Sequence, residues 1–202
     1  MLGAIAGDII GSIYENFRTK RRNFRQFTPF SFFTDDTVLT VAVADAILHQ
    51  KDYGDSIRKY AWRYPFAAMT RSSCCGCCHH LRKLLQQRYG YDLNRTVYDI
   101  RPHYRLNLTC QGSVLEAIIA FLDSNDFEDA IRNAVSLGGD ADTQASIAGA
   151  IAEAFYGGVP DEILLQTWKR LNKNFQCVVR DFYAYFGMKI GSSTMQSASQ
   201  KT

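Results

Sequence analysis

Apolar residues recur along most of this chain at spacings of three and four, which is the periodicity of an amphipathic α-helix. No pair of alternating segments and no Asn-Gly or Asp-Gly turn predicts a β-hairpin. We therefore predict an all-α fold. The expected helices cover residues 3–16, 34–49, 55–63, 79–88, 92–100, 112–124, 126–139, 142–158, 160–172 and 176–186.

Several expected helix ends carry recognisable capping residues. Asp126 is a typical N-cap with Asp129 three residues later, and Gly138-Gly139 is a typical C-terminal stop. Pro160 suits the first turn of the helix that follows it. We expect a single domain over residues 1–187 and a polar, disordered tail over 188–202.

The first expected helix places Gly3, Gly7 and Gly11 at intervals of four, a stripe that lets another helix approach closely. It lacks the G-x-G-x-x-G spacing of a dinucleotide site. It is not a signal peptide either, because no basic region precedes it and Asp8 interrupts the apolar run. Without an export signal we expect a cytoplasmic protein with reduced cysteines.

Composition narrows the functional classes further. The chain has 202 residues, 47% of them hydrophobic and 21% charged, with a formal net charge of +3. No stretch is apolar enough for a membrane span, and the charge is too small to indicate nucleic-acid binding. We interpret the one short basic run, at Lys20, Arg21, Arg22 and Arg25, as a solvated loop.

Two acidic motifs stand at expected helix N-termini, Thr34-Asp35-Asp36-Thr37 and Gly138-Gly139-Asp140-Ala141-Asp142-Thr143. Each motif by itself is explained by helix capping. Brought together, however, four aspartates would repel one another unless cations were bound between them. Carboxylate and hydroxyl oxygens suit Mg²⁺ or Mn²⁺, so the two motifs together predict a dinuclear metal site.

The segments "GAIAGDIIGSIYE", "FTDDT" and "SLGGDADTQASIAGAIAEAFYG" resemble the signature segments of the ADP-ribosylglycohydrolase family. The resemblance covers residues 1–64 and about 83–172. It implies a compact helical domain with two Mg²⁺ or Mn²⁺ ions in a central cleft. It also implies an ordering role for Glu15 beside the metals and a structural role for Asp8. The implied metal ligands are Thr34, Asp35, Asp36, Asp140, Asp142 and Thr143.

The resemblance also implies a reaction, hydrolysis of the glycosidic bond between ADP-ribose and an arginine or serine side chain, or in a related ADP-ribosyl compound. Asp35, Asp36 and Glu15 are the candidate catalytic carboxylates. An ADP-ribosylated protein or a small ADP-ribosyl molecule is the expected partner, with no nucleic acid or membrane. The candidate substrate-binding residues are Gln111, Gly112, Ser113, Gly138 and Gly139.

The resemblance is interrupted between Tyr64 and about Lys83. Here the family carries a Gly-Asn-Gly-x-x-Met-Arg loop and a Thr-His-x-His-Pro segment of the substrate pocket, and residues 67–71 keep only a fragment of the first. The domain is thus truncated in the middle, which predicts lower stability, local repacking or oligomerisation through the gap. A non-catalytic metal- or ADP-ribose-binding relative and a crystallin-like structural protein are the alternatives to an enzyme.

The same region contains Cys74, Cys75, Cys77, Cys78, His79 and His80. The Cys-x-x-Cys spacing allows a zinc site or a redox pair, but a tetrahedral zinc site takes its second ligand pair from a separate turn. No such pair is present elsewhere in the sequence. We interpret the cluster as a junction sequence.

Overall fold

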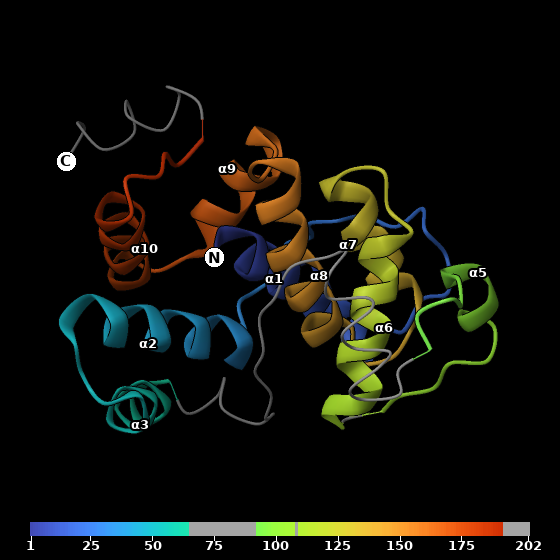
Figure 1. The fold of residues 1–202 in the computed structure, drawn as a ribbon, viewed down its shortest axis with the longest axis horizontal. Coiled ribbons are helices and arrows are strands. Elements are labelled where there is room, and N and C mark those ends of the chain that lie inside the picture. Colours follow the sequence, from blue (N-terminus) through green and yellow to red (C-terminus); the bar gives the residue numbers. More distant parts are fainter. Residues whose placement is uncertain (65–91, 108, 192–202) are drawn as a thin grey trace.

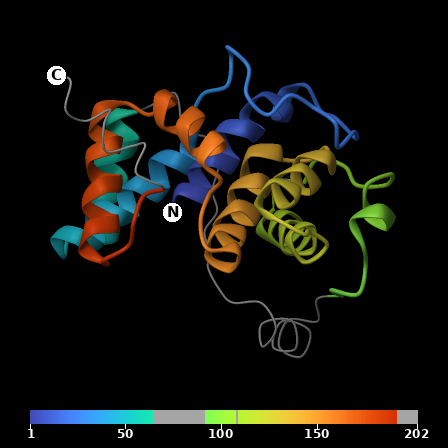
Figure 2. The same cartoon turned by 90° about the horizontal axis from the view of Figure 1, so that it is seen from above.

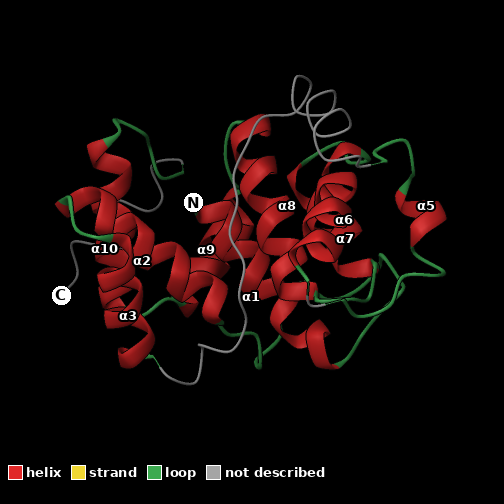
Figure 3. Cartoon of the chain, turned by 60° about the horizontal axis from the view of Figure 1, so that its bottom comes forward, coloured by secondary structure: helices red, strands yellow, loops and turns green. Residues whose placement is uncertain are grey.

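The computed structural model describes residues 1–64, 92–107 and 109–191, and in this part of the chain every regular element is a helix (Figure 3). The all-α prediction is confirmed. None of the described helices is long and apolar enough to cross a membrane. The helices are α1 (Leu2–Asn16), α2 (Asp35–His49), α3 (Tyr53–Arg63), α5 (Val97–Ile100), α6 (Cys110–Leu122), α7 (Phe127–Ser136), α8 (Ala141–Tyr156), α9 (Asp161–Arg170) and α10 (Lys173–Tyr185).

Most of the predicted helices and caps are confirmed. The Asp126 side chain accepts a hydrogen bond from the backbone N–H of Asp129, and the chain leaves α7 through Gly138, whose φ is 66°. The helix expected at 79–88 and the cysteine–histidine cluster at 74–80 lie outside the described residues. So does most of the expected tail, from residue 192 onwards.

Several expected helices differ at their ends. The helix predicted at 92–100 is only the four-residue α5, because Thr96 and Asp99 form a capping box that starts it at Val97. The last helix begins at Lys173 rather than near 176, because the Asn172 side chain accepts a hydrogen bond from the Phe175 N–H. Pro160 precedes the first turn of α9 rather than belonging to it.

Helices α1 and α8 run side by side through the centre of the molecule (Figures 1 and 2). Gly3 faces Gly149, Gly7 faces Ala145, and Gly11 faces Ala141, so the two helices are antiparallel. A side chain at any of the three α1 glycines would overlap backbone atoms of α8. The predicted close helix approach is therefore confirmed, and it brings the C-terminal half of α1 against the N-terminus of α8.

The remaining faces of α1 contribute to two hydrophobic cores. Ala6 and Ile10 belong to a core shared with α5, α6, α7 and α8, whereas Leu2, Ile5 and Ile9 belong to a core shared with α2, α9 and α10. In Figure 1, α5, α6 and α7 of the first core lie to the right of α1, and α2 and α10 of the second lie to its left. Burial on every side explains why α1 is apolar over almost its whole length.

The loop between α1 and α2 is fastened to the helices beneath it. Arg132 of α7 donates hydrogen bonds to the carbonyl oxygens of Arg22 and Phe24, at 2.9 and 3.0 Å. Lys20 donates to the carbonyl oxygens of Tyr104 and Leu137. Lys20 is exposed, in agreement with the interpretation of this run as a solvated loop, and its ammonium group also satisfies a carbonyl oxygen at the C-terminus of α7.

Candidate metal centre

Carboxylates from α1, α2 and the N-terminus of α8 gather where these helices meet. They form two groups that share Asp142: Asp8, Asp36 and Asp142 form the first group, and Glu15, Asp140 and Asp142 form the second. Within each group one carboxylate oxygen of every residue lies within 4.8 Å of the others. This spacing allows each group to hold one cation, with Asp142 between the two positions.

Asp8 is fully buried and fixes the start of α2. Its Oδ2 accepts hydrogen bonds from the backbone N–H groups of Thr34 and Thr37, at 2.8 and 3.2 Å, and from the Thr37 hydroxyl. Its Oδ1 accepts from the Thr34 hydroxyl. An acid on α1 thus satisfies the free N–H groups of α2, a task that the N-cap residue ordinarily performs.

Thr143 joins the two acidic motifs directly. Its hydroxyl donates to Asp36 Oδ2 at 3.0 Å, although 107 residues separate the two in sequence. Its backbone N–H donates to Asp142 Oδ1, also at 3.0 Å. Both interactions keep an aspartate of the first group oriented toward its neighbours.

The electrostatic cost of this arrangement is visible in the pKa values. Burial, reinforced by the charges of Asp8 and Asp142, raises the pKa of Asp36 to about 8. Burial and the neighbouring Asp142 likewise raise the pKa of Asp140 to about 8. The pKa of Glu15 is raised by burial and by Asp142 and Asp35. These carboxylates therefore resist carrying negative charge in the absence of a counter-ion.

The donor set fits a hard divalent cation. Asp140 Oδ1 is buried and has no hydrogen-bond partner among the described residues, so one acceptor is left without a proton donor. Carboxylate oxygens converging from three directions are what Mg²⁺ and Mn²⁺ prefer, and a cation would relieve both the repulsion and the unsatisfied acceptor.

The structure brings most of the predicted site residues together. Glu15, Asp36, Asp140 and Asp142 are members of the two carboxylate groups, and Thr143 contacts Asp36. The other two predicted ligands, Asp35 and Thr34, are not members of either carboxylate group. Asp35 is buried nearby, close enough to influence Glu15 and Asp36, and the Thr34 hydroxyl donates to Asp8.

Asp8 is the member of the carboxylate groups that was not among the predicted catalytic, metal-binding or substrate-binding residues. The sequence did carry a signal for it, since an acid within an apolar, glycine-rich helix is costly unless it has partners. The structural role implied for Asp8 is compatible with its four hydrogen bonds. Its place in the first group adds a possible ligand oxygen.

The candidate substrate-binding residues lie on two neighbouring turns. Thr109 caps α6 by accepting from the Gly112 N–H, and the Ser113 hydroxyl donates to the Asn107 carbonyl. Gly138 and Gly139 form the turn before Asp140. The side chain of Gln111 lies outside the described residues. The tyrosine that connects these two turns, Tyr104, was not identified from the sequence.

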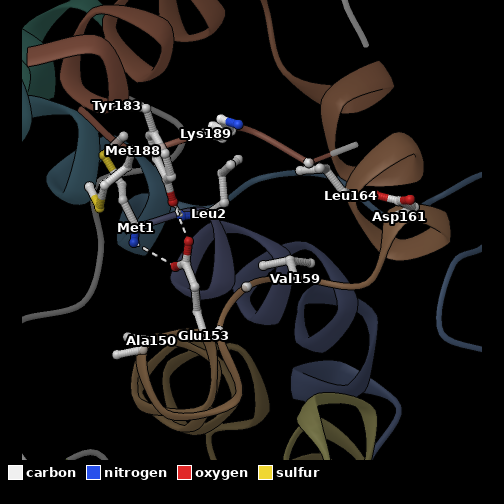
Figure 4. A pocket seen from close by; sticks show the side chains of 14 residues that line it. Met1, Leu2, Ala150, Glu153, Val159, Asp161, Leu164, Tyr183, Met188 and Lys189 are labelled. Carbon is white, nitrogen blue, oxygen red and sulfur yellow. Dashed lines mark hydrogen bonds and ion pairs between the residues drawn. The ribbon is translucent and has the colours of Figure 1, made fainter. Parts of the chain in front are cut away.

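A cavity of about 690 Å³ lies at the opposite end of the α1–α8 pair (Figure 4). Its polar wall is the Glu153 carboxylate, which accepts from the ammonium group of Met1 at 2.6 Å, from the Gly3 N–H and from the Tyr183 hydroxyl. None of the acidic groups described above lines this cavity. The candidate site is therefore the carboxylate cluster and not the cavity.

The helical fold and the gathered carboxylates define a class, a helical protein with a buried acidic site suited to hard divalent cations. Residues 95–189 match the family model described as ADP-ribosylglycohydrolase. This match agrees with the motif resemblance to the ADP-ribosylglycohydrolase family. The match spans α5 to α10 and includes Asp140, Asp142 and Thr143.

Comparisons with curated proteins and with solved structures found no match. The matched family suggests a hydrolase that acts on the glycosidic bond of ADP-ribosylated substrates.

Proposed function

We propose that this protein is a metal-dependent hydrolase that cleaves the glycosidic bond between ADP-ribose and an arginine or serine side chain, or in a related ADP-ribosyl compound. The observation that carries the proposal is the convergence of Asp36 with Asp140 and Asp142 across about a hundred residues of sequence. Capping alone explains each motif separately but gives no reason for the motifs to share one buried point.

Two Mg²⁺ or Mn²⁺ ions would be held by Asp8, Asp36, Asp142, Glu15 and Asp140, with Thr34, Asp35 and Thr143 beside them. When bound, such ions bind ribose hydroxyls and lower the pKa of water. The carboxylates balance that positive charge, so the ligand set suits a pair of divalent ions better than one.

Glu15 is well placed to accept the proton of the attacking water. It is half-buried, whereas Asp140 and Asp142 are buried. Burial and the neighbouring Asp142 raise its pKa and therefore its basicity. Asp36 is the alternative base, because Thr143 occupies only its Oδ2.

The surrounding negative charge suits the expected transition state. Cleavage of a glycosidic bond passes through a species with positive charge on the anomeric carbon and ring oxygen. Asp35 and Asp36 stand at the N-terminus of α2, whose start is fixed by Asp8. Carboxylates held in this way stabilise developing positive charge without having to reorganise.

The deciding experiment measures release of ADP-ribose from arginine- and serine-linked ADP-ribosyl peptides with Mg²⁺ or Mn²⁺. The Asp35→Ala/Asp140→Ala variant should lose at least a hundredfold in rate. The Asp55→Ala/Asp181→Ala variant, which removes two exposed carboxylates from α3 and α10, should keep the wild-type rate. Equal release by the wild type and the Asp35→Ala/Asp140→Ala variant would refute the proposal that this protein is a hydrolase.

Calorimetry with free ADP-ribose then distinguishes the two alternatives raised by the truncated middle of the domain. Binding without turnover would identify a non-catalytic ADP-ribose-binding relative. If the protein neither binds nor cleaves ADP-ribosyl compounds, the structural role is the alternative that remains.

A further inference from the structure

Tyr104, in the segment between α5 and α6, links the two turns that carry the candidate substrate-binding residues. Its hydroxyl donates to the carbonyl oxygen of Gly112 in the first turn of α6, at 2.8 Å. The same hydroxyl accepts from Gln144 Nε2 of α8, at 2.9 Å. One side chain therefore connects the start of α6 with the start of α8.

The ring of Tyr104 also lies against the turn that precedes Asp140. A Cβ atom at Gly139 would overlap Cε1 of the tyrosine, so the ring is in contact with the Gly139 backbone. Lys20 donates to the carbonyl oxygens of Tyr104 and of Leu137, the residue before Gly138. The turn between α7 and α8 is thus held by contacts with the tyrosine ring and with a lysine.

Gln144 transmits this restraint to the carboxylates. It is fully buried and lies one helical turn after Asp140, whose carbonyl oxygen accepts from the Gln144 N–H at 2.9 Å. The Gln144 Oε1 has no hydrogen-bond partner in the part of the chain that the structure describes, so the bond to Tyr104 is the one that orients its side-chain amide. Burial, with the charges of Glu116 and Asp140, raises the pKa of Tyr104 to about 12. The hydroxyl consequently keeps its proton and can donate throughout the physiological range.

We propose that Tyr104 is a positioning residue that acts through Gly139 and Gln144 to hold Asp140 and Asp142 in the arrangement that binds a divalent cation. The inference rests on the proposed function in one respect, that these carboxylates bind a metal. It extends that function by assigning a role to a residue 36 positions before Asp140 that contacts no carboxylate of the site by a hydrogen bond.

The test is Tyr104→Phe, which keeps the ring and removes the hydroxyl. Partners that orient metal ligands typically contribute ten- to hundredfold in affinity, so the Mn²⁺ dissociation constant should rise on the order of tenfold. Electron paramagnetic resonance of free Mn²⁺ measures it without reference to activity. The matched control is Tyr156→Phe, since that hydroxyl donates to the Ser124 carbonyl at the far end of α8. The control should bind Mn²⁺ as the wild type does.

A second readout needs no metal. Amide hydrogen exchange at residues 139–144 of the metal-free protein should become faster in Tyr104→Phe and stay unchanged in Tyr156→Phe. Wild-type Mn²⁺ affinity in Tyr104→Phe would overturn the inference, even if exchange were faster, because Tyr104 would then only stabilise the fold. If the wild type itself binds no Mn²⁺, the proposed function fails. Unchanged hydrogen exchange in Tyr104→Phe would overturn the positioning role of Tyr104, whether or not the wild type binds Mn²⁺.

Discussion

At the scale of single residues, the Asp8 carboxylate both caps a helix and can supply negative charge. Substitutions of Asp8 can separate these two roles. Three of its four hydrogen bonds reach Oδ2, and only the Thr34 hydroxyl reaches Oδ1. An asparagine can therefore keep the three bonds at its amide oxygen. The Thr34 hydroxyl can rotate to accept from the new NH₂ group.

We expect Asp8→Asn to remain within about 1 kcal/mol of the wild-type free energy of unfolding, whereas Asp8→Ala loses about 2–4 kcal/mol because buried donors are left unsatisfied. Burial raises the pKa of Asp8 to about 7, so below that pH the neutral amide resembles the form that the folded protein prefers. Urea denaturation of both variants at pH 6 in EDTA measures the difference. Equal losses in the two variants would show that the charge, and not the hydrogen bonding, holds α2.

At the scale of elements, the contact between α1 and α8 sets the distance between the acidic motifs. A Cβ atom at Gly7 would overlap the backbone carbonyl group of Ala145, and backbone cannot rotate away as a side chain can. The two helices would have to separate. Asp8 and Asp142 would move apart with them, because each lies on one of the two helices.

We therefore expect Gly7→Ala to lower the free energy of unfolding by about 1–3 kcal/mol, as overpacking of a close contact does, even though alanine favours helix more than glycine. Gly54→Ala is the control, since a Cβ there would meet only the ends of the Asp52 and Arg58 side chains. That variant should be neutral or slightly stabilised. Urea denaturation decides, and a stabilised Gly7→Ala would mean that α1 and α8 are not in close contact.

At the scale of the whole molecule, the sequence predicted what depends on local pattern or on recognisable motifs, and it missed contacts between distant segments that belong to no motif. Leu93, Val97 and Ile100 are all buried, so their periodicity correctly indicated a core face. Leu93, however, lies in a segment without regular secondary structure, and periodicity alone does not distinguish its burial there from burial in a helix. Asp36 and Asp140 were found through their motifs. Tyr104 belongs to no motif, and its role follows only from packing against Gly139.

The metal-free molecule as a whole should become less stable as the pH rises. The pKa values of Asp8, Asp36 and Asp140, about 7, 8 and 8, lie well above the value near 3.9 expected for an unfolded chain. A raised folded-state pKa gives stability that is complete below the unfolded value and is lost as the pH rises through the folded one. In EDTA the melting temperature should therefore fall from about pH 4 to about pH 8 and change little above that.

A divalent cation should reverse this trend, because it binds the ionised carboxylates and must displace their protons at lower pH. Mg²⁺ at about 100 times its dissociation constant adds about 2.7 kcal/mol, which corresponds to roughly 5–10 °C for a chain of this size. The increase should be present at pH 8.5 and nearly absent at pH 5.5. Asp36→Asn/Asp140→Asn should flatten both curves. A melting temperature that rises with pH in EDTA would mean that these carboxylates are not forced together in the folded protein.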